Sequence, residues 1–186
     1  MSKFIHLHTH SHYSLLNALP KIPELVEAAK KDGMEALALT DNGNLYGAIE
    51  FYKTCLKEKM KPIIGVDAYV AARTRHDKQA GIDNTRTRLV LLAKNEAGYK
   101  NLLKLVTTSY LEGFYYRPRI DRELIEKYAG DLVAITPSFS GDVIVAIKQK
   151  DLARAKEIIV WYKKVFGTDN FFIETTHHPE LENHES

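Results

Sequence analysis

The chain has 186 residues, a hydrophobic fraction of 45%, a charged fraction of 27% and a single cysteine. This composition excludes a disordered, collagen-like or disulfide-stapled protein and indicates one soluble globular domain, since a chain of this length can bury a sizeable core unaided. The formal net charge of +2 excludes a surface that grips nucleic acid or an anionic membrane by bulk electrostatics alone.

Short runs rich in Val, Ile, Leu or aromatic residues predict strands, and longer runs with apolar residues at three- and four-residue spacing predict helices between them. The expected strands are Phe4–His10, Ala36–Thr40, Pro62–Val70, Arg88–Ala93, Leu132–Thr136 and Phe171–Thr175. The expected helices are Pro23–Lys31, Tyr46–Glu58, Ala97–Leu111, Arg122–Tyr128, Gly141–Lys148 and Leu152–Val165. This alternation is typical of βα units around a parallel sheet or barrel.

Other segments carry weaker signals. The polar, unpatterned stretch ARTRHDKQAGIDNTR, near residues 72–87, predicts a mobile loop or lid. The start MSKFIHLHTH lacks the pattern of a signal peptide, and no apolar run reaches the roughly 20 residues that cross a bilayer, so a cytoplasmic location is expected. Cys55 lies in a helical pattern and is expected to be a buried or half-buried thiol without a role.

Four of the eight histidines stand in the run HLHTHSH, at positions 6, 8, 10 and 12. The two-residue period of a strand would point these imidazoles to one side. His8 and His10 form a His-x-His pair at the end of the first expected strand, which favours a metal site. His6 and His12 stay undecided between ligands and ordinary polar residues.

Further candidate ligands follow the carboxyl ends of other expected strands, where parallel α/β folds open their sites. The residues in these positions are Asp41 after LALT, Asp67 in PIIGVDAYV, Ser138 after VAIT and His178 after FFIETT. Strand polarity predicts that His8, His10, Asp41, Asp67 and His178 meet at one mouth. Each also has an ordinary interpretation, since Asp41 could shape an Asx turn, Asp67 could bond at a barrel rim and His178 could be an exposed loop residue.

The segments HLHTHSHYSLL, LALTDNGNLYGAIEFYK, KPIIGVDAYVA, LVLLAKNEAGYKNLLKL and EGFYYRPRIDRELI together resemble the amino-terminal PHP (polymerase and histidinol phosphatase) domain of the bacterial DNA polymerase III alpha subunit. The resemblance implies a distorted (β/α)7 PHP barrel. In members that keep every ligand, its cleft holds about three metal ions that activate a water and stabilise a leaving oxygen. Such members can act as metal-dependent phosphoesterases or proofreading 3′-5′ exonucleases.

Matched to the family, His8 and His10 occupy the first metal motif, Asp41 the second, and His178 the late histidine. The departures are Asp67 for a glutamate, Asn42 for the histidine of TDHGN, Arg88 for a histidine, Ser138 for a cysteine and Asn17 for a carboxylate. Neutral oxygens bind divalent ions weakly, and Arg88 brings a permanent positive charge that repels them by several kcal/mol even at an effective dielectric constant near 20. Arg88 is expected to pair with Asp41 or Asp67 instead.

The resemblance therefore predicts a degenerate site with no confident catalytic residue or cofactor, and leaves open a residual zinc or manganese ion. The family's last motif, on a strand of the type ATNDxHY, is expected beyond residue 186. Residues 1–186 are expected to be an incomplete PHP domain, truncated before the last strand, with about six of the seven βα units that the resemblance implies. An exposed seam of this kind is expected to favour dimerisation or poor solubility.

Three functions remain open at this stage. The preferred one is an inactive structural module of a DNA-directed DNA polymerase, a nucleotidyltransferase of DNA replication whose later palm domain binds magnesium. By resemblance, its partners are the polymerase body, the proofreading exonuclease subunit and, through the parent enzyme, DNA, with no membrane. The alternatives are an active phosphoesterase or 3′-5′ exonuclease and a free-standing binding module. The runs FYYRPRIDR and ARTRHDK could contact template, although solvated surface is the simpler interpretation.

Overall fold

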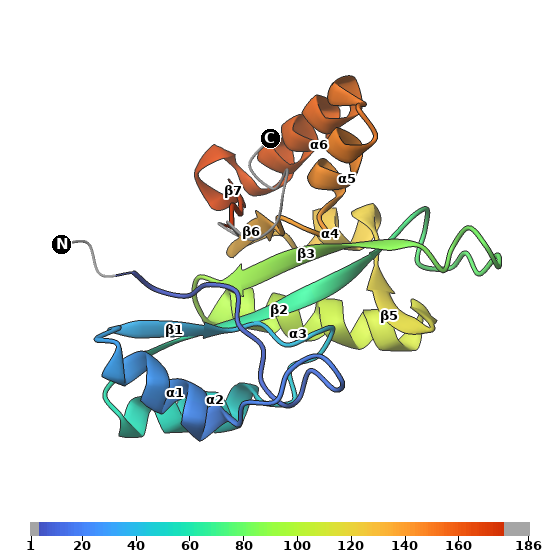
Figure 1. Ribbon diagram of the computed structural model, residues 1–186. Helices are drawn as coiled ribbons and strands as arrows, with labels where there is room; N and C mark the ends of the chain where they lie inside the picture. The colour runs from blue at the N-terminus through green and yellow to red at the C-terminus, as the bar shows by residue number, and fades with distance from the viewer. Residues whose placement is uncertain (1–3, 177–186) are drawn as a thin grey trace.

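Seven strands and six α-helices follow one another in residues 4–176, the part of the chain that the computed structural model describes (Figure 1). The strands are β1 (Ala36–Leu39), β2 (Lys61–Ala71), β3 (Arg86–Ala93), β4 (Phe114–Tyr115), β5 (Arg117–Ile120), β6 (Leu132–Thr136) and β7 (Phe171–Ile173). The helices are α1 (Ile22–Lys31), α2 (Ala48–Lys57), α3 (Glu96–Leu111), α4 (Arg122–Tyr128), α5 (Asp142–Lys148) and α6 (Leu152–Phe166), with a short 3-10 helix at Thr168–Asn170.

Most elements lie where the sequence pattern predicts them. The helix α4 and the strand β6 match the prediction residue for residue, and the other expected helices and later strands differ by no more than two residues at either end. Cys55 is fully buried in α2, as expected, and this burial raises the pKa of its thiol to about 11. Within residues 4–176, no helix combines the length and the apolar character that a membrane span requires.

The expected strand over Phe4–His10 is wrong, because this segment runs beside β1 without forming a regular ladder. Ala38 N donates to His6 O over 3.0 Å, and Thr40 N donates to Thr9 O over 2.8 Å. Side chains supply the remaining contacts, since Thr9 N donates to Thr40 Oγ1 and Thr40 Oγ1 donates to Thr9 O, both at 2.9 Å. The strict alternation that would align four histidines is therefore lost.

The hairpin of β4 and β5 is missing from the prediction. It turns at Tyr116, whose φ of 59° is unusual for a residue with a side chain. A two-residue strand is too short to show a period of two, and Pro118 argues locally against a strand. The pairing is decided instead by contact with β2, where Tyr69 and Val70 align with Arg119 and Ile120.

The strands form one mixed sheet in the order β4-β5-β2-β3-β6-β7, with β1 paired to the first half of β2. Neighbours run parallel except around β3, which is antiparallel to both β2 and β6, and within the β4-β5 hairpin. The expectation of βα units around a parallel sheet or barrel is therefore corrected at β3. As a consequence, the first residues of β3, not its last, lie beside the carboxyl end of β2.

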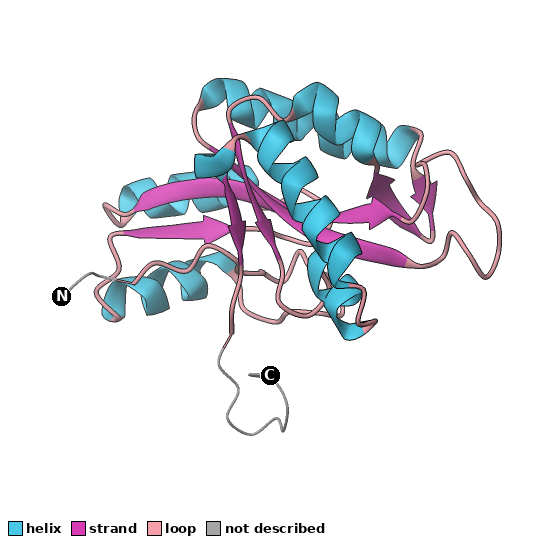
Figure 2. Ribbon diagram, turned by 90° about the horizontal axis from the view of Figure 1, so that it is seen from above, coloured by secondary structure: helices cyan, strands magenta, loops and turns pink. Residues whose placement is uncertain are grey.

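Helices cover the sheet in two groups (Figures 1 and 2). The larger core joins the sheet to α3, α4, α5 and α6, and a second core joins α1 and α2 to β1. A small cluster on the other face of β3 consists of Ala38, Val90, Leu92 and Ile135. Because side chains alternate along a strand, Arg88 lies on this same face, farther toward the end where the site forms.

The loop from residue 72 to residue 85 has no helix or strand, as expected, but it makes many polar contacts. Arg73 forms an ion pair with the buried Asp83, and Arg75 donates to both carboxylate oxygens of Asp121 at 3.1 Å. The guanidinium of Arg119, fully buried, donates to backbone carbonyls at both ends of this loop. The mobility of the loop stays a prediction.

Within the described residues, β7 pairs only with β6, and the amino-terminal segment lies against the far side of β1. A side-chain contact joins these two ends, because His8 Nδ1 lies 2.8 Å from Glu174 Oε1. The sheet is thus linked between its first and last segments by an ion pair and not by a ladder. Dimerisation along this seam stays a prediction that light scattering can check.

Candidate functional site

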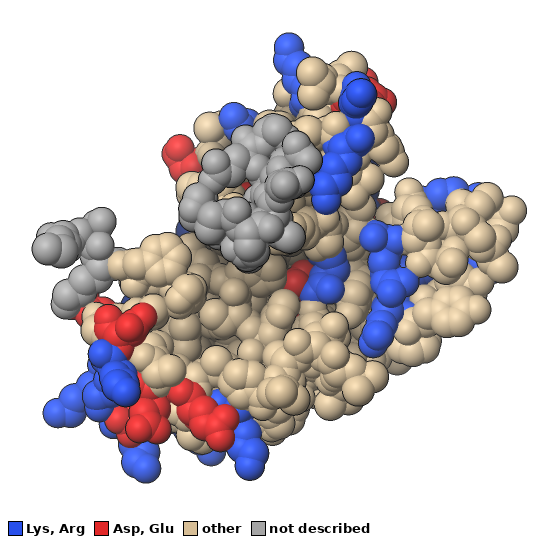
Figure 3. All heavy atoms as spheres, in the orientation of Figure 1, with Lys and Arg blue, Asp and Glu red and all other residues tan. Residues whose placement is uncertain are grey.

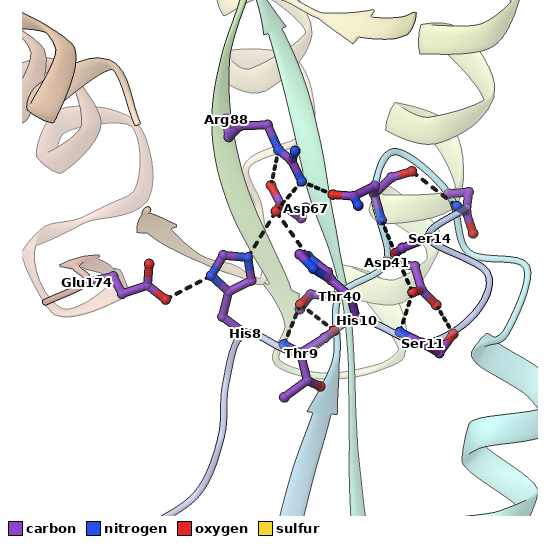
Figure 4. A network of polar contacts seen from close by, with 12 residues as sticks. His8, Thr9, His10, Ser11, Ser14, Thr40, Asp41, Asp67, Arg88 and Glu174 are labelled. Carbon is purple, nitrogen blue, oxygen red and sulfur yellow. Dashed lines mark hydrogen bonds and ion pairs between the residues drawn. The ribbon is translucent and has the colours of Figure 1, made fainter. Parts of the chain in front are cut away.

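The candidate site lies where the amino-terminal segment, the end of β2 and the start of β3 meet the residue that follows β7 (Figure 4). The residues that meet there are His8, His10, Asp67, Arg88 and Glu174. Strand polarity predicted the meeting of the two histidines with Asp67. The position of Arg88 depends on the antiparallel direction of β3, which places it beside Tyr69 of β2.

Asp67 is the centre of this cluster and is only 2% exposed. Arg88 Nε donates to Asp67 Oδ1 over 2.8 Å, and Arg88 Nη2 contacts Oδ2 and also the side-chain oxygen of Asn42. The same Oδ2 faces His8 Nε2 at 2.9 Å and His10 Nε2 at 3.2 Å. Burial works to raise the pKa of Asp67, but the hydrogen bonds from Arg88, His10 and His8 outweigh it and hold this pKa far below its usual value.

His8 lies between two carboxylates. Its Nε2 faces Asp67 and its Nδ1 faces Glu174 Oε1 at 2.8 Å, so both ring nitrogens must carry a proton to make both bonds. Burial alone would lower the pKa of His8, but the bonds to Asp67 and Glu174 raise it to about 9. The ring is therefore an imidazolium at neutral pH and is one of two cations that neutralise this site.

Arg88 is held on three sides. Its guanidinium lies 4.7 Å from the ring centroid of Tyr69, in addition to its bonds to Asp67 and Asn42. Burial would lower the pKa of Arg88, but the bond to Asp67 raises it. The sequence left open whether Arg88 pairs with Asp41 or Asp67, and the structure pairs it with Asp67.

Asp41 is buried and accepts its side-chain hydrogen bonds from serines. Its Oδ1 accepts from Ser11 N at 2.7 Å and from Ser14 Oγ at 2.6 Å, and its Oδ2 accepts from Ser11 Oγ at 2.8 Å. The group of possible metal ligands in the described residues contains His8, His10 and Asp67, and the role of Asp41 as a further ligand stays a prediction. Two serine hydroxyls, which the sequence did not single out, satisfy the carboxylate.

The other candidate residues lie at varied distances from the cluster. Ser138 donates through its backbone nitrogen to Glu174 Oε2 at 3.0 Å, so it borders the site. Asn17 is exposed and donates to Leu15 O, with no contact to the cluster. His6 is exposed, His12 packs against the ring of Tyr13, and His178 lies outside the described residues.

Glu174 is the residue that sequence reasoning missed. It follows β7 in the run FFIETT, and its side chain bridges His8 and Ser138. Burial raises the pKa of Glu174, but the bonds from His8 and from the backbone of Ser138 outweigh this and lower it. The signal in the sequence is the position of Glu174, which directly follows the carboxyl end of a strand as the aspartates do.

His8, His10 and Asp67 offer three ligand atoms that lie within 4.8 Å of one another, which is the composition of a metal site. The surrounding residues do not suit the group of divalent ions that the resemblance implies. Arg88 already bonds both oxygens of Asp67, and His8 has no lone pair to donate while it is an imidazolium. At an effective dielectric constant near 20, a guanidinium about 4 Å from a divalent ion costs several kcal/mol.

The pKa of His8 predicts a pH dependence of folding. A folded-state pKa of about 9, above the ordinary value of 6.5, means that the stabilisation is fully present below about pH 6.5 and is lost as pH rises through 9. We expect the free energy of unfolding to fall by a few kcal/mol over this range. Urea unfolding at a series of pH values measures it, and NMR titration of the His8 ring gives the pKa directly.

The control for this prediction is His8→Gln, which removes the titrating ring and keeps every other ionisable residue in the chain. It should remove most of the pH dependence of the free energy of unfolding between about pH 7 and 9.5. An NMR-derived pKa near 6.5 for His8 in the folded protein would contradict the two-carboxylate arrangement.

Asp41→Asn is expected to destabilise the fold through its serine network. The amide keeps one acceptor oxygen but presents an NH2 group to a hydroxyl or backbone donor, so the free energy of unfolding should fall by about 1–3 kcal/mol. Chemical denaturation measures this value, with Asn17→Ala as the exposed control. If Asp41→Asn also changed zinc affinity, Asp41 would act as a ligand in solution, contrary to this geometry.

The mixed sheet and the histidine cluster at its amino-terminal segment are the features expected of a PHP domain. A family model confirms this class: the chain belongs to the PHP domain family, whose model matches residues 6–178. This is the family that the histidine run and the later motifs resemble, so the resemblance is confirmed.

Curated relatives extend this result. The chain is 50% identical over 178 residues to the DNA polymerase III subunit alpha of Borreliella burgdorferi, covering 95% of this chain and 15% of the relative. It is 41% identical over 190 residues to the protein of the same name from Aquifex aeolicus, covering 98% of this chain and 16% of the relative. The chain therefore spans only a small part of the length of these relatives.

Among solved structures, an amidohydrolase from Chromobacterium violaceum, determined with bound sulfate and no metal, matches with a TM-score of 0.54. The match covers 95% of this chain and 78% of that chain, at 12% sequence identity. This likeness supports the fold alone, and the α/β PHP-barrel class expected from the sequence is confirmed.

Proposed function

We propose that this chain is the PHP module of a bacterial replicative DNA polymerase, and that it serves there as a structural support without hydrolytic activity of its own. Its relatives at 41% and 50% identity carry the name DNA polymerase III subunit alpha, which supports the parent enzyme. The observation that carries the structural role is the bond of Arg88 to both oxygens of Asp67. This bond engages the carboxylate that a catalytic metal would need as a ligand.

The chemistry of the cluster supports this proposal. Metal-assisted phosphoester hydrolysis needs a divalent ion to lower the pKa of a water and to stabilise the leaving oxygen. Here the acceptors are already satisfied, since Asp67 accepts from three cationic or polar side chains and Asp41 from two serines. The same bonds join β2, β3 and the amino-terminal segment, so they stabilise the fold.

The proposal includes partners and location. The polymerase body, a proofreading exonuclease subunit and DNA bound by the parent enzyme are the expected partners, in the cytoplasm. Zinc or manganese is proposed at most as a weak occupant of the cleft, and magnesium as the cofactor of the parent polymerase. The names of the relatives support the polymerase body and DNA, and the remaining partners follow from the family resemblance.

An active metal-dependent phosphoesterase or 3′-5′ exonuclease is the second candidate function. The close grouping of His8, His10 and Asp67 favours it, because two imidazoles and a carboxylate are common zinc ligands. In this alternative, Arg88 would have to leave Asp67 for the metal to bind.

Hydrolysis assays separate the two candidates. The purified chain is incubated with Mn²⁺ or Zn²⁺ and either bis(p-nitrophenyl) phosphate or a 3′-labelled oligonucleotide, beside the variant His8→Ala/His10→Ala. We expect no turnover above that of the variant. Metal-dependent turnover that the double substitution abolishes would replace the structural role by the second candidate function.

A further inference from the structure

A group of exposed aromatic and arginine side chains lies beside the histidine cluster. We call it the aromatic–arginine face, and its residues are Tyr46, Arg86, Tyr110, Phe114, Tyr116 and Arg117. Three of the rings are strongly exposed, at 63% for Tyr46, 50% for Phe114 and 69% for Tyr116. The rings are neighbours, since Tyr46 Oη lies 3.3 Å from Tyr110 Oη and the ring centroids of Tyr110 and Phe114 are 6.3 Å apart.

Two arginines of this face are held by one buried ring. The guanidinium carbons of Arg86 and Arg117 lie 5.5 Å and 5.9 Å from the ring centroid of Tyr69. That ring is itself fixed, because it packs so closely over the backbone of Gly43 that a Cβ added there would lie 3.1 Å from it. Tyr69 therefore positions both guanidinium groups before any ligand arrives.

Neither guanidinium is neutralised. Arg88, the third cation on Tyr69, pairs with Asp67, but no carboxylate in the part of the chain that the structure describes forms an ion pair with Arg86 or Arg117. Figure 3 shows Lys and Arg side chains gathered beside the ends of β2 and β3, whereas Asp and Glu mix with Lys and Arg over α1 and α2. Two exposed, oriented and uncompensated guanidinium groups form a site for anions.

The exposure of Tyr116 is not explained by folding. Its backbone has a φ of 59°, which is disfavoured for an aromatic residue, and its ring stays 69% exposed. Among the described residues, its one aromatic neighbour is Tyr115. Burial of the ring does not offset this unfavourable backbone conformation. A strained backbone that carries an exposed aromatic ring is typical of a residue that contacts a ligand.

We propose that the aromatic–arginine face binds single-stranded nucleic acid, with phosphates on Arg86 and Arg117 and bases stacked on the exposed rings. Single strands are recognised by cationic grooves combined with aromatic side chains, and both parts are present here. An acidic peptide would use the two cations but would leave several flat rings uncovered. This surface lies outside the histidine cluster, so the proposal stands whether or not the structural role of that cluster is correct.

Fluorescence anisotropy with a labelled oligodeoxythymidylate tests the phosphate contacts. We expect the chain to bind this oligonucleotide with an affinity that falls as salt rises. Each phosphate contact on a single strand adds about 0.7 to the slope of log affinity against log salt, so the slope should be smaller by about 1.4 in Arg86→Ala/Arg117→Ala. The control Lys163→Ala/Lys164→Ala removes the same charge from exposed positions on α6 and should keep the original slope. No binding by the unmodified chain, or equal slopes in both double variants, would overturn the proposal.

Tyr116→Asn tests stacking separately. Asparagine tolerates the left-handed conformation, so the variant should be at least as stable as the unmodified chain, while its affinity for the oligonucleotide should fall about fivefold or more. An unchanged affinity would refute the stacking role. Polyglutamate at equal charge should compete far more weakly than the oligonucleotide, and equal competition would assign the face to an acidic protein partner instead.

Discussion

Replacing Arg88 by alanine is expected to turn the salt-bridged cluster into a zinc site. The substitution frees both oxygens of Asp67 and removes a guanidinium that the structure places in direct contact with this carboxylate. His8 and His10 then have a carboxylate partner without a competing cation, and all three ligand atoms already lie within 4.8 Å of one another. We expect zinc affinity to increase at least about 100-fold, measured by isothermal titration calorimetry.

Stability gives a second measurement on the same variant. Without metal, Arg88→Ala leaves the buried Asp67 without its strongest partner, which should lower the free energy of unfolding by about 3 kcal/mol or more. Zinc should restore this loss in Arg88→Ala but not in a variant that also carries His8→Ala and His10→Ala. Tight binding of two or more ions by the unmodified chain would show that Arg88 does not block the site.

Arg119→Met is expected to cause the second large effect, on the loop from residue 72 to residue 85. Arg119 is fully buried, and its guanidinium donates to the backbone carbonyls of Gly113, Asp83, Arg75 and Asp77 at 2.8–3.0 Å. Methionine fills similar space but leaves these four carbonyls, three of which are in buried contacts, without this donor. We expect the free energy of unfolding to fall by about 3 kcal/mol or more, measured by chemical denaturation.

Limited proteolysis then reports on the loop itself. Trypsin should cleave Arg119→Met within this loop much faster than the unmodified chain, because Arg75 and Asp83 lose their common donor. The neighbouring exposed residue gives a matched control, Arg117→Met, which should leave the cleavage rate unchanged. Rapid cleavage of the unmodified chain would favour the mobile loop that the sequence predicts.

Local patterns were sufficient for most of the secondary structure. Amphipathic spacing located α3 and α6, and the runs LVAIT and PIIGVDAYV located β6 and β2, because buried strands and half-buried helices require these apolar periods. The amino-terminal segment escaped this reasoning. Its alternation has the period of a strand, but the Thr40 hydroxyl bonds the backbone of Thr9, and this pairing depends on a residue 31 positions away.

Only part of the candidate site could likewise be predicted from the sequence. His8, His10 and Asp67 could be grouped from strand polarity, and the charge of Arg88 alone predicts that it opposes metal binding. Asp41 was grouped with them on the same reasoning but turns toward Ser11 and Ser14. A carboxylate bonds the nearest available donors, and local sequence does not specify which hydroxyls those will be.

By itself, the sequence determined the family, the positions of the helices and of five of the strands, and which ionisable residues line the cleft, because these follow from residue types and short-range periodicity. Only the tertiary structure decided that β3 runs antiparallel, that Arg88 pairs with Asp67, and that Glu174 and His8 join the two ends of the sheet. These outcomes depend on contacts between residues 21 and 166 positions apart in the chain. Such pairings are selected by the burial and hydrogen bonding of the whole fold, which no local pattern encodes.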